Sequence, residues 1–404
     1  MGSSMNSAVS GLRAHQLMLD VSGNNIANVN TPGFKAGRAT FSDVLSQTLA
    51  GATAPGTSRG GVDPQQVGLG VRTGAVTNLF TQGGILTTNK PTDLAIQGEG
   101  FFVVNDGTSD YYTRAGAFEV DAAGNLVDSV TGYRVQGAAG DIVISPTATA
   151  APAGTSTATF TGNLDGTTAT GGTYTATVAV YDSLGGVHNL TLTFTKTAAA
   201  GEWTYAATEA DGAMSIAAGG AGTIQFGGSG ALTAGAAGSV TLNFTNGASS
   251  GQAITLDFAS AGNTSPVTGF ASPSTLALAS QDGYASGTLQ TFAIGADGSI
   301  SGTFSNGRVQ TLGTLRLATF SNPAGLVKMG SNLYRESSNS GVANVGDPGT
   351  AGRGTLAAGA LEGSNVDLAE EFTRLIVAQR GFQANARVIT TSDEVMMEAV
   401  NLKR

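Results

Sequence analysis

The segment from Leu368 to Val400 constrains this chain most, because one kind of side chain recurs there at alternating steps of four and three residues. Most members of the repeat are apolar: Leu368, Phe372, Leu375, Gln379, Phe382, Ala386, Ile389, Asp393, Met396 and Val400. On a helix this spacing forms one stripe, and a stripe sustained over several heptads is typical of a coiled-coil seam. An amphipathic helix on a globular core is the alternative, although a helix this long is uncommon in compact domains. Ser364 or Asn365 is expected to cap the helix.

A second, less regular stripe lies at the other end of the chain. The sequence predicts a helix from Ser4 to Asn28, which the turn-forming run 28–33 terminates. Its apolar positions are Met5, Val9, Leu12, Leu19 and Ile26. Gln16 and Gly23 interrupt the stripe. We expect the two terminal helices to pair, so that each covers the seam of the other.

The sequence between the two helices has the pattern of β structure. Two hairpins are predicted, one from Tyr111 to Val130 and one from Leu289 to Phe304, each around a glycine-containing turn. The section from Thr155 to Ser280 is rich in Thr, Ala and Gly, and its apolar residues alternate strictly with polar ones. Such alternation predicts antiparallel strand pairs of a sandwich or a barrel.

These segments follow one another in a nested order: helix, β unit, inserted β domain, the same β unit resumed, helix. Nesting brings the two ends of a chain together. The predicted fold class is therefore multidomain α+β, with paired terminal helices and nested antiparallel β domains. The expected boundaries are 1–30 and 361–404 for the helical coiled coil, 31–75 and 351–360 for a connecting linker, 76–151 and 281–350 for the first β domain, and 152–280 for the inserted outer domain.

Composition excludes several classes of protein. The net charge is −9, and Lys196 is the only Lys or Arg between residues 146 and 280, whereas nucleic-acid binding needs clustered basic residues. The chain has no cysteine, which excludes disulfides and thiolate metal sites. No apolar run is long enough to cross a membrane, and no basic segment followed by an apolar core opens the chain. We therefore expect neither membrane insertion nor a cleaved signal peptide.

A search for catalytic chemistry finds little. The two histidines, His15 and His188, each lack a second ligand at metal-binding spacing, so both are interpreted as packed or surface residues. No phosphate-binding glycine motif is present. A hydrolase would need a carboxylate pair, but Trp203 is the only tryptophan and no aromatic cleft accompanies the acids. The loosely grouped acids are Asp93, Glu99, Asp106 and Asp110. The sequence predicts no catalytic residue, no metal and no cofactor.

Several motifs at the two ends and in the first β unit resemble one known family. They are Ala8-Val-Ser-Gly-Leu12, 19–28, Thr31-Pro-Gly-Phe-Lys35, 93–102, Tyr112-Thr-Arg-Ala-Gly116, 359–368, 375–380 and 382–385. Together they are similar to the bacterial flagellar rod and hook axial proteins, over about the first 140 and last 120 residues. The insert, which includes 178–186 and His188, resembles the outer domain of the hook branch of that family.

The resemblance implies a structural subunit and not an enzyme. Such a subunit would leave the cell without a cleaved signal, through the flagellar export apparatus, and would polymerise into a curved hollow tube at the cell surface. The tube would act as a universal joint that transmits motor torque to the filament. Implied partners are other copies of the chain, the distal rod protein, the hook cap and the hook-filament junction proteins. The seam expected to mediate self-assembly comprises Val9, Leu12, Leu19, Ile26, Leu368, Phe372, Leu375, Phe382, Ile389, Met396 and Val400.

Three other interpretations remain open. Rod proteins of the family are expected to be shorter, with little inserted between the β halves, so a distal rod or other hook-family component is the nearest alternative. The Thr-rich insert would also suit a secreted adhesin or carbohydrate-binding module. An enzyme is the weakest of the three, and it would require a concave site that gathers two or more carboxylates with shifted pKa values.

Overall fold

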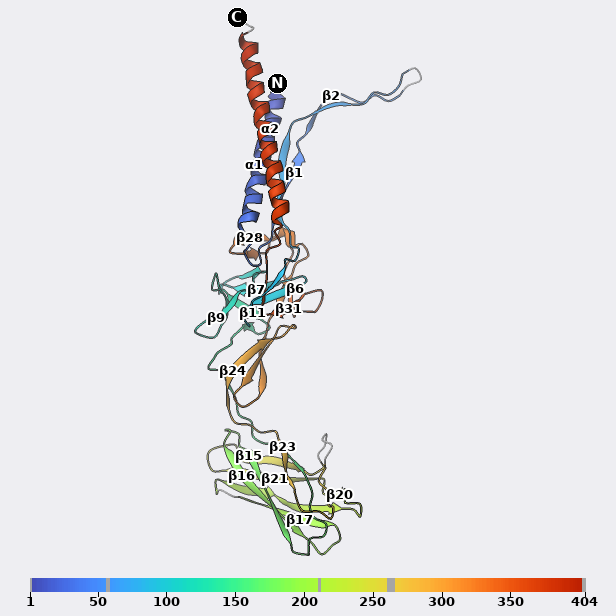
Figure 1. Ribbon diagram of the computed structural model, residues 1–404, viewed down its shortest axis with the longest axis vertical. Coiled ribbons are helices and arrows are strands. Elements are labelled where there is room, and N and C mark those ends of the chain that lie inside the picture. The colour runs from blue at the N-terminus through green and yellow to red at the C-terminus, as the bar shows by residue number, and fades with distance from the viewer. Residues whose placement is uncertain (1, 56–58, 210–211, 260–265, 402–404) are drawn as a thin grey trace. The chain divides into compact units, whose positions relative to one another are not determined.

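The computed structural model describes residues 2–55, 59–209, 212–259 and 266–401. The chain divides into two compact units, and Figure 1 shows the course of the chain through them. Unit 1 comprises residues 1–145, 292–301 and 311–404, and unit 2 comprises residues 146–291 and 302–310. The insert that the sequence predicts at 152–280 therefore lies inside unit 2, which extends further on both sides.

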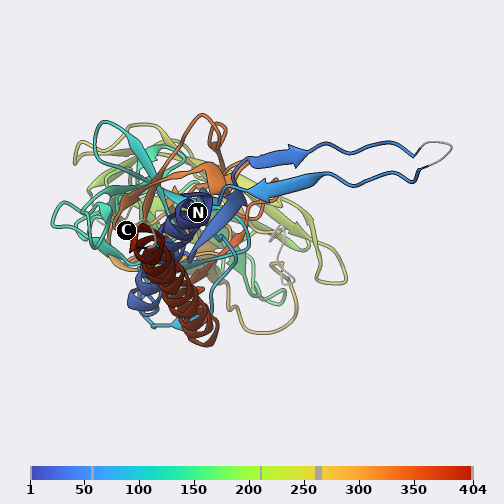
Figure 2. The same ribbon diagram turned by 90° about the horizontal axis from the view of Figure 1, so that it is seen from above.

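Unit 1 contains both helices, α1 (Gly2–Ala27) and α2 (Leu368–Asn401). They pack side by side (Figures 1 and 2), so the predicted pairing is confirmed. The expectation that each helix covers the apolar stripe of the other is wrong, because the helices meet through residues beside those stripes, such as Gly11 and Gly381. The N-cap of α2 is Asp367, not Ser364 or Asn365: its Oδ1 accepts hydrogen bonds from the backbone N–H groups of Ala369 (2.8 Å) and Glu370 (3.2 Å). A carboxylate in this place satisfies two free N–H groups and complements the helix dipole.

The segment expected to be a linker, 31–75, forms strands. Strand β1 (Gly37–Asp43) pairs with β4 (Val71–Asn78), and β2 (Ser46–Ala50) pairs with β3 (Gln65–Gly68), both antiparallel. The β2–β3 ribbon extends away from the helices in Figure 2, and both of its strands are exposed along their whole length. Because neither face of the ribbon is buried, the sequence carries no alternating pattern there by which the strands could be predicted.

The first β domain lies within unit 1 around a ten-stranded sheet with the main order β28-β29-β8-β7-β11-β10-β9. The predicted hairpin around residues 121–125 is confirmed as the pair β9–β10. Two smaller pairs, β31–β6 and β32–β5, bring the segment before α2 onto the strands that follow the ribbon. The strands of this region are β5 (Ile85–Thr87), β6 (Leu94–Gln97), β7 (Phe101–Asn105), β8 (Asp110–Thr113), β9 (Phe118–Val120), β10 (Leu126–Asp128), β11 (Arg134–Gly137), β12 (Gly140–Asp141), β27 (Leu317–Thr319), β28 (Val327–Gly330), β29 (Leu333–Arg335), β30 (Asn344–Gly346), β31 (Thr355–Ala358) and β32 (Ala360–Glu362), with a short 3-10 helix at Pro323–Gly325.

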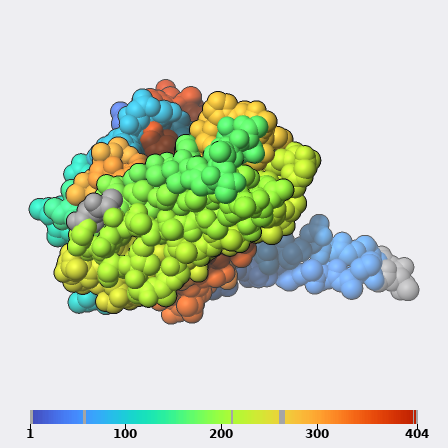
Figure 3. Space-filling model, turned by 90° about the horizontal axis from the view of Figure 1, so that it is seen from below, coloured from blue at the N-terminus to red at the C-terminus, as the bar shows by residue number. Residues whose placement is uncertain are grey.

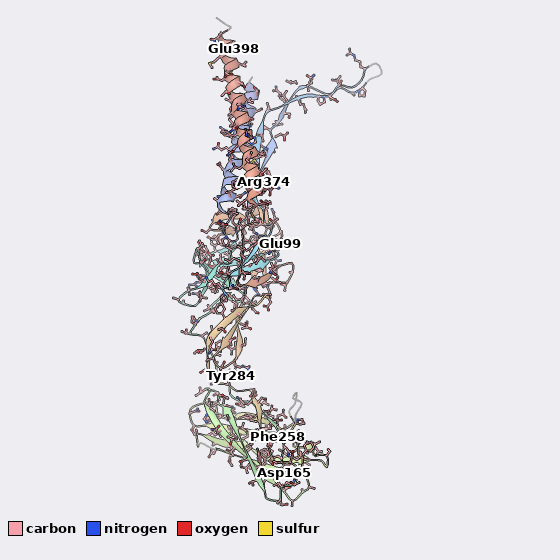
Figure 4. All side chains as sticks on the ribbon, viewed as in Figure 1. Glu99, Asp165, Phe258, Tyr284, Arg374 and Glu398 are labelled. Atoms are coloured by element: carbon pink, nitrogen blue, oxygen red, sulfur yellow. The ribbon has the colours of Figure 1, made fainter. Side chains whose placement is uncertain are left out.

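Unit 2 is a β sandwich of two five-stranded sheets, ordered β18-β21-β22-β14-β23 and β15-β16-β17-β19-β20. Alternate residues of both sheets meet in one core. Phe258, labelled in Figure 4, lies 5.0 Å from Phe160 and 5.3 Å from Tyr205 between ring centroids. The strands are β14 (Thr157–Thr161), β15 (Thr173–Tyr181), β16 (Val187–Lys196), β17 (Glu202–Glu209), β18 (Met214–Gly219), β19 (Ala221–Phe226), β20 (Leu232–Ala234), β21 (Ala237–Phe244), β22 (Gln252–Asp257) and β23 (Ala277–Gln281). Figure 3 shows the surface of unit 2 in green and yellow.

The segments that enter and leave the sandwich are bonded to each other. Thr155 Oγ1 donates to Gln281 Oε1 (3.0 Å), and the backbone N–H of Ser156 donates to Asp282 Oδ1 (2.8 Å). A further sheet, ordered β13-β24-β25-β26, contains residues at which the chain passes between the units, and its hairpin β24–β25 was expected from the sequence. Its strands are β13 (Thr149–Ala150), β24 (Gly287–Ile294), β25 (Ser299–Phe304) and β26 (Val309–Thr314). No helix of the described residues is long and apolar enough to cross a membrane.

Candidate functional site

The two helices contact each other through a stripe of mostly small and polar residues. Three pairs show where the helices meet: Gly11 with Asn385, Gly381 with His15, and Asn25 with Glu371. Buried or half-buried positions at helical spacing extend these pairs into a stripe, which on α1 is Ala8, Gly11, His15, Met18, Ser22 and Asn25, and on α2 is Glu371, Arg374, Ala378, Gly381, Asn385 and Ser392. A methyl group added at Gly11 would lie 2.8 Å from Asn385 Nδ2, and one added at Gly381 would overlap the His15 imidazole. The helices therefore approach closely at both glycines.

The apolar stripe predicted from the sequence lies one residue further along each helix than the contact stripe. Its members include Val9, which is 36% exposed, Phe372 at 52% and Val400 at 70%. Leu12, Leu19, Ile26, Leu375 and Ile389 are half-buried, and Leu368, Phe382 and Met396 are exposed. The helix pair thus covers its small residues and leaves much of its large apolar surface open.

Both apolar stripes lie on the same side of the helix pair. On each helix, the step from the contact stripe to the apolar stripe is one residue, a rotation of about 100° in the same sense along the chain. The helices run antiparallel, since Gly11 meets Asn385 whereas Asn25 meets Glu371. Rotations of the same sense on antiparallel helices lead to the same side, so the two stripes form one surface. We call this surface, made of the eleven predicted seam residues, the apolar face.

The opposite flank of α1 is covered by the β1–β4 pair. Ser10 Oγ accepts a hydrogen bond from the backbone N–H of Val71 (3.1 Å), and Gly37 lies against Val21. Ser10 and Val21 each precede a residue of the contact stripe by one position, which places them on the side away from the apolar face. The strands therefore cover one flank of the pair and leave the other open.

A buried ion cluster lies below the helices in unit 1, where distant parts of the chain meet. Glu362 Oε1 is 2.6 Å from Lys35 Nζ, and Glu362 Oε2 is 3.3 Å from Arg114 Nη1. All three side chains are almost completely buried. Burial lowers the pKa of Lys35, and the hydrogen bond and negative charge of Glu362 oppose that shift. Arg114 also lies over the ring of Phe101, 5.4 Å from its centroid.

Backbone groups and one amide complete this junction. Lys35 Nζ donates to Thr81 O (2.7 Å), and the backbone N–H of Gly33 donates to Glu362 O (2.7 Å). Asn365 links the residue just before β1 to the residue just after β4, since its Oδ1 accepts a hydrogen bond from Ala36 N (2.8 Å) and its Nδ2 donates one to Leu79 O (2.7 Å). The junction therefore fixes the segment after α1 against the segment before α2.

Sequence reasoning missed this junction. Its charged members, Lys35, Arg114 and Glu362, lie in three of the motifs that resemble the flagellar family. They are far apart in the sequence and share no periodicity. The available signal was chemical. Lys35, Arg114 and Glu362 each stand in such a motif, and a charged residue within a glycine-rich or apolar motif is a candidate for a buried pair.

Unit 2 holds one buried histidine in a polar network. His188 Nε2 is 3.0 Å from Asp182 Oδ2, and Asp182 also accepts hydrogen bonds from Asn246 and from the backbone N–H groups of Leu184 and Gly186. Burial alone would raise the pKa of Asp182, but these hydrogen bonds outweigh it and bring the pKa to about 2. His188 is thus a packed residue, one of the two readings left open by the sequence.

Of the four acids considered for hydrolysis, Asp106 lies beside Asp141, an acid that the sequence analysis did not single out. Asp106 and Asp141 line one shallow concavity, and both have lowered pKa values. Hydrogen bonds from Thr108 and Ser109 bring the pKa of Asp106 to about 2, and Gln136 and Arg134 lower that of Asp141. A general acid needs a raised pKa, so this pair has the wrong shift. Within the described ranges, no group of three or more His, Asp or Glu side chains is placed to hold a metal ion.

Comparison with known families assigns segments of the chain in the same order as the fold. Residues 5–35 match the flagella basal body rod protein family, 95–160 the flagellar hook protein FlgE/F/G D1 domain, 148–284 the flagellar basal body protein FlaE D2 domain, and 357–402 the C-terminal region of the flagellar basal body rod FlgEFG proteins. The matched segments contain most of α1, part of the first β domain, all ten strands of the sandwich and all of α2.

Relatives match over their whole length. The flagellar hook protein FlgE of Borreliella burgdorferi is 39% identical over 438 residues, with 99% of each chain covered. The chain belongs to the flagellar hook protein family. The hook protein FlgE of Treponema pallidum is also 39% identical, again over 99% of both chains. The family is a structural one, and it belongs to the flagellum.

A rod protein and a solved structure refine this assignment. The flagellar basal-body rod protein FlgG of Bacillus subtilis is 32% identical over 402 aligned positions, with 99% of each chain covered. The crystal structure of Helicobacter pylori flagellar hook protein FlgE2 matches 69% of this chain and all of its own, with a TM-score of 0.50 and 15% identity. At that identity the structure supports the fold alone.

Proposed function

We propose that this chain is the repeating subunit of a flagellar hook and that its apolar face binds other copies of the chain. The observation that carries the proposal is the position of that face. Apolar side chains from both helices share one flank, and the strands cover the other flank, where Val9 borders a hollow beside Val71 of β4. A contiguous apolar surface of this kind is rare on a protein that stays monomeric, and a long apolar helix stripe needs a partner in water.

The finer role follows from membership of the family. The subunits polymerise into a curved hollow tube between the rod and the filament, and the tube transmits torque as a universal joint. Export proceeds through the flagellar apparatus without a cleaved signal. The distal rod protein, the hook cap and the hook-filament junction proteins contact the tube or its growing end. The chain has no catalytic role in this proposal.

Hook is favoured over rod by sequence identity, since the two hook relatives are 39% identical to this chain and the rod relative is 32% identical. The adhesin alternative requires a ligand site on the sandwich. The carboxylate of Asp182 is buried and takes its hydrogen bonds from groups of unit 2, so it is not presented to a ligand.

Replacing Leu12 and Phe382 together by Gln tests the role of the apolar face. Both residues lie on the face, and burying a side chain of this size contributes about 1.5–3 kcal/mol. We expect the L12Q/F382Q variant to remain folded, as judged by circular dichroism, and to lose polymers in sedimentation and electron microscopy. The matched control is Ile376→Gln, because Ile376 is 57% exposed on α2 but lies beyond the apolar face. Normal polymers of the double variant would contradict the proposal.

A further inference from the structure

We propose that two reciprocal notches, Gly11 against Asn385 and Gly381 against His15, lock the register of the helix pair. Helical glycine costs about 0.5–1 kcal/mol relative to alanine, so a helix retains it where a neighbour needs the space. Here each helix supplies one glycine and one larger side chain that fills the glycine of the other. The register lock, defined as these four residues, rests on the proposed function because it positions the apolar face.

A hydrogen bond within α2 links the two notches. Asn385 Nδ2 donates a hydrogen bond to the backbone O of Gly381 (2.9 Å), one turn earlier on α2. The amide that fills the space over Gly11 is therefore tied to the residue that receives His15. A methyl group at Gly381 would overlap the imidazole of His15, whose Nδ1 is already buried. Both His15 and Asn385 are half-buried, and in each case it is the end of the side chain that occupies the space over the glycine.

The notches define a single antiparallel register. Four residues separate Gly11 from His15, and four separate Gly381 from Asn385. A polar contact at the base of the pair agrees with this spacing, because Asn25 Nδ2 donates to Glu371 Oε1 (3.1 Å), ten residues beyond His15 and ten before Gly381. Of the remaining positions of the contact stripe, Ala8, Ser22, Ala378 and Ser392 are small and offer little resistance to sliding, whereas Met18 and Arg374 are larger. The lock and the Asn25–Glu371 bond thus keep the apolar residues of the two helices level.

A third helical glycine, Gly23, lies outside the register lock. Gly23 lies on α1 twelve residues after Gly11, and a methyl group added there would meet no atom within 4 Å. Gly23 belongs to the apolar stripe and not to the contact stripe. Replacing Gly23 by Ala therefore changes helix propensity without touching the lock, which makes it the matched control.

Disulfide trapping in the soluble full-length chain tests the lock without requiring polymers. The chain has no cysteine, so cysteines at Met18 and Ala378, which are level in this register, report the register alone. We expect M18C/A378C to form its disulfide readily under mild oxidation. Adding Gly381→Ala should slow disulfide formation about tenfold or more, because overpacked cores shift their backbones. Adding His15→Ala to that variant should restore the rate, since the obstructing ring is gone. Adding Gly23→Ala to the cysteine pair should leave the rate unchanged.

Two results would overturn the register lock. One is a disulfide rate for Gly381→Ala equal to that of the parent pair, and the other is failure of His15→Ala to restore it. Failure of the parent pair to cross-link would also overturn it, because the register would then not be set within one chain. The proposed function fails separately, through polymerisation of the L12Q/F382Q variant, so the two failures are distinguishable.

Discussion

The sandwich of unit 2 and the helix pair of unit 1 place their large apolar residues in opposite ways. In the sandwich, alternate side chains of both sheets enter one core, and residues such as Phe160, Leu192 and Trp203 are almost completely buried. In the helix pair, the buried positions are mainly small or polar, and residues such as Phe372 and Val400 remain open to solvent. The sandwich buries its apolar surface within one chain, whereas the helix pair leaves much of its apolar surface exposed, and we propose that this surface binds another copy of the chain.

A single tryptophan makes this comparison measurable. Trp203 lies in the core of the sandwich, and both helices lie in unit 1. Its fluorescence therefore follows the unfolding of unit 2, and the helical circular dichroism signal follows unit 1. A change confined to one region should move one transition and leave the other in place.

The largest effect is expected from Glu362→Gln. This change removes the buried counter-charge of Lys35 and Arg114 and leaves only the exposed Glu99 carboxylate, 4.0 Å from Arg114. Breaking a buried pair in this way costs about 3–5 kcal/mol. The urea midpoint of the unfolding transition followed by helical circular dichroism should fall, while the midpoint followed by Trp203 fluorescence should not change. Glu119→Gln is the control, because its ion pair with Lys90 is exposed and contributes less than about 1 kcal/mol. Equal shifts in both transitions would show that the regions unfold as one.

A smaller effect, confined to the transition of unit 2, is expected from replacing Asp182. The pKa of Asp182 is lowered from 3.8 to about 2 in the folded protein, so its stabilisation is present above pH 3.8 and is lost as the pH falls toward 2. Such a shift corresponds to stability on the order of 2 kcal/mol. Asp182→Asn should flatten the dependence of the Trp203 transition on pH in this window and leave the helical transition unaffected. An unchanged pH profile would mean that the network of Asp182, His188 and Asn246 adds little stability.

The sequence carries different amounts of information about the two regions. In the sandwich, strict alternation predicts the strands because the same residues that alternate are the ones that enter the core. In the helices, hydrophobic periodicity predicts the apolar stripe. It does not predict the contact stripe one residue earlier, because Ala, Gly, Ser and Asn residues do not stand out in a hydrophobic pattern. Gly11 and Gly381 were the available signal, since interior helical glycines mark close approach.

Two other features of unit 1 could not be predicted for physical reasons. The β2–β3 ribbon buries neither face, so residues such as Leu49, which is 64% exposed, follow no alternation. The junction of Lys35, Arg114 and Glu362 depends on charges brought together by the nested chain, and a pairing at such separation has no local pattern. Arg374 and Glu398, labelled in Figure 4, mark the length of α2, which the sequence predicts well because its stripe is long.

Hydrogen exchange of the full-length chain, measured before and after polymerisation, tests the central contrast most directly. If the helices keep their apolar face for other copies, backbone amides of α1 and α2 should gain the most protection on polymerisation, because helices stabilised on a second face open less often. The core strands of the sandwich, such as β16, should change little because they are already buried within one chain. Protection gained mainly in the sandwich, with the helices unchanged, would contradict the account.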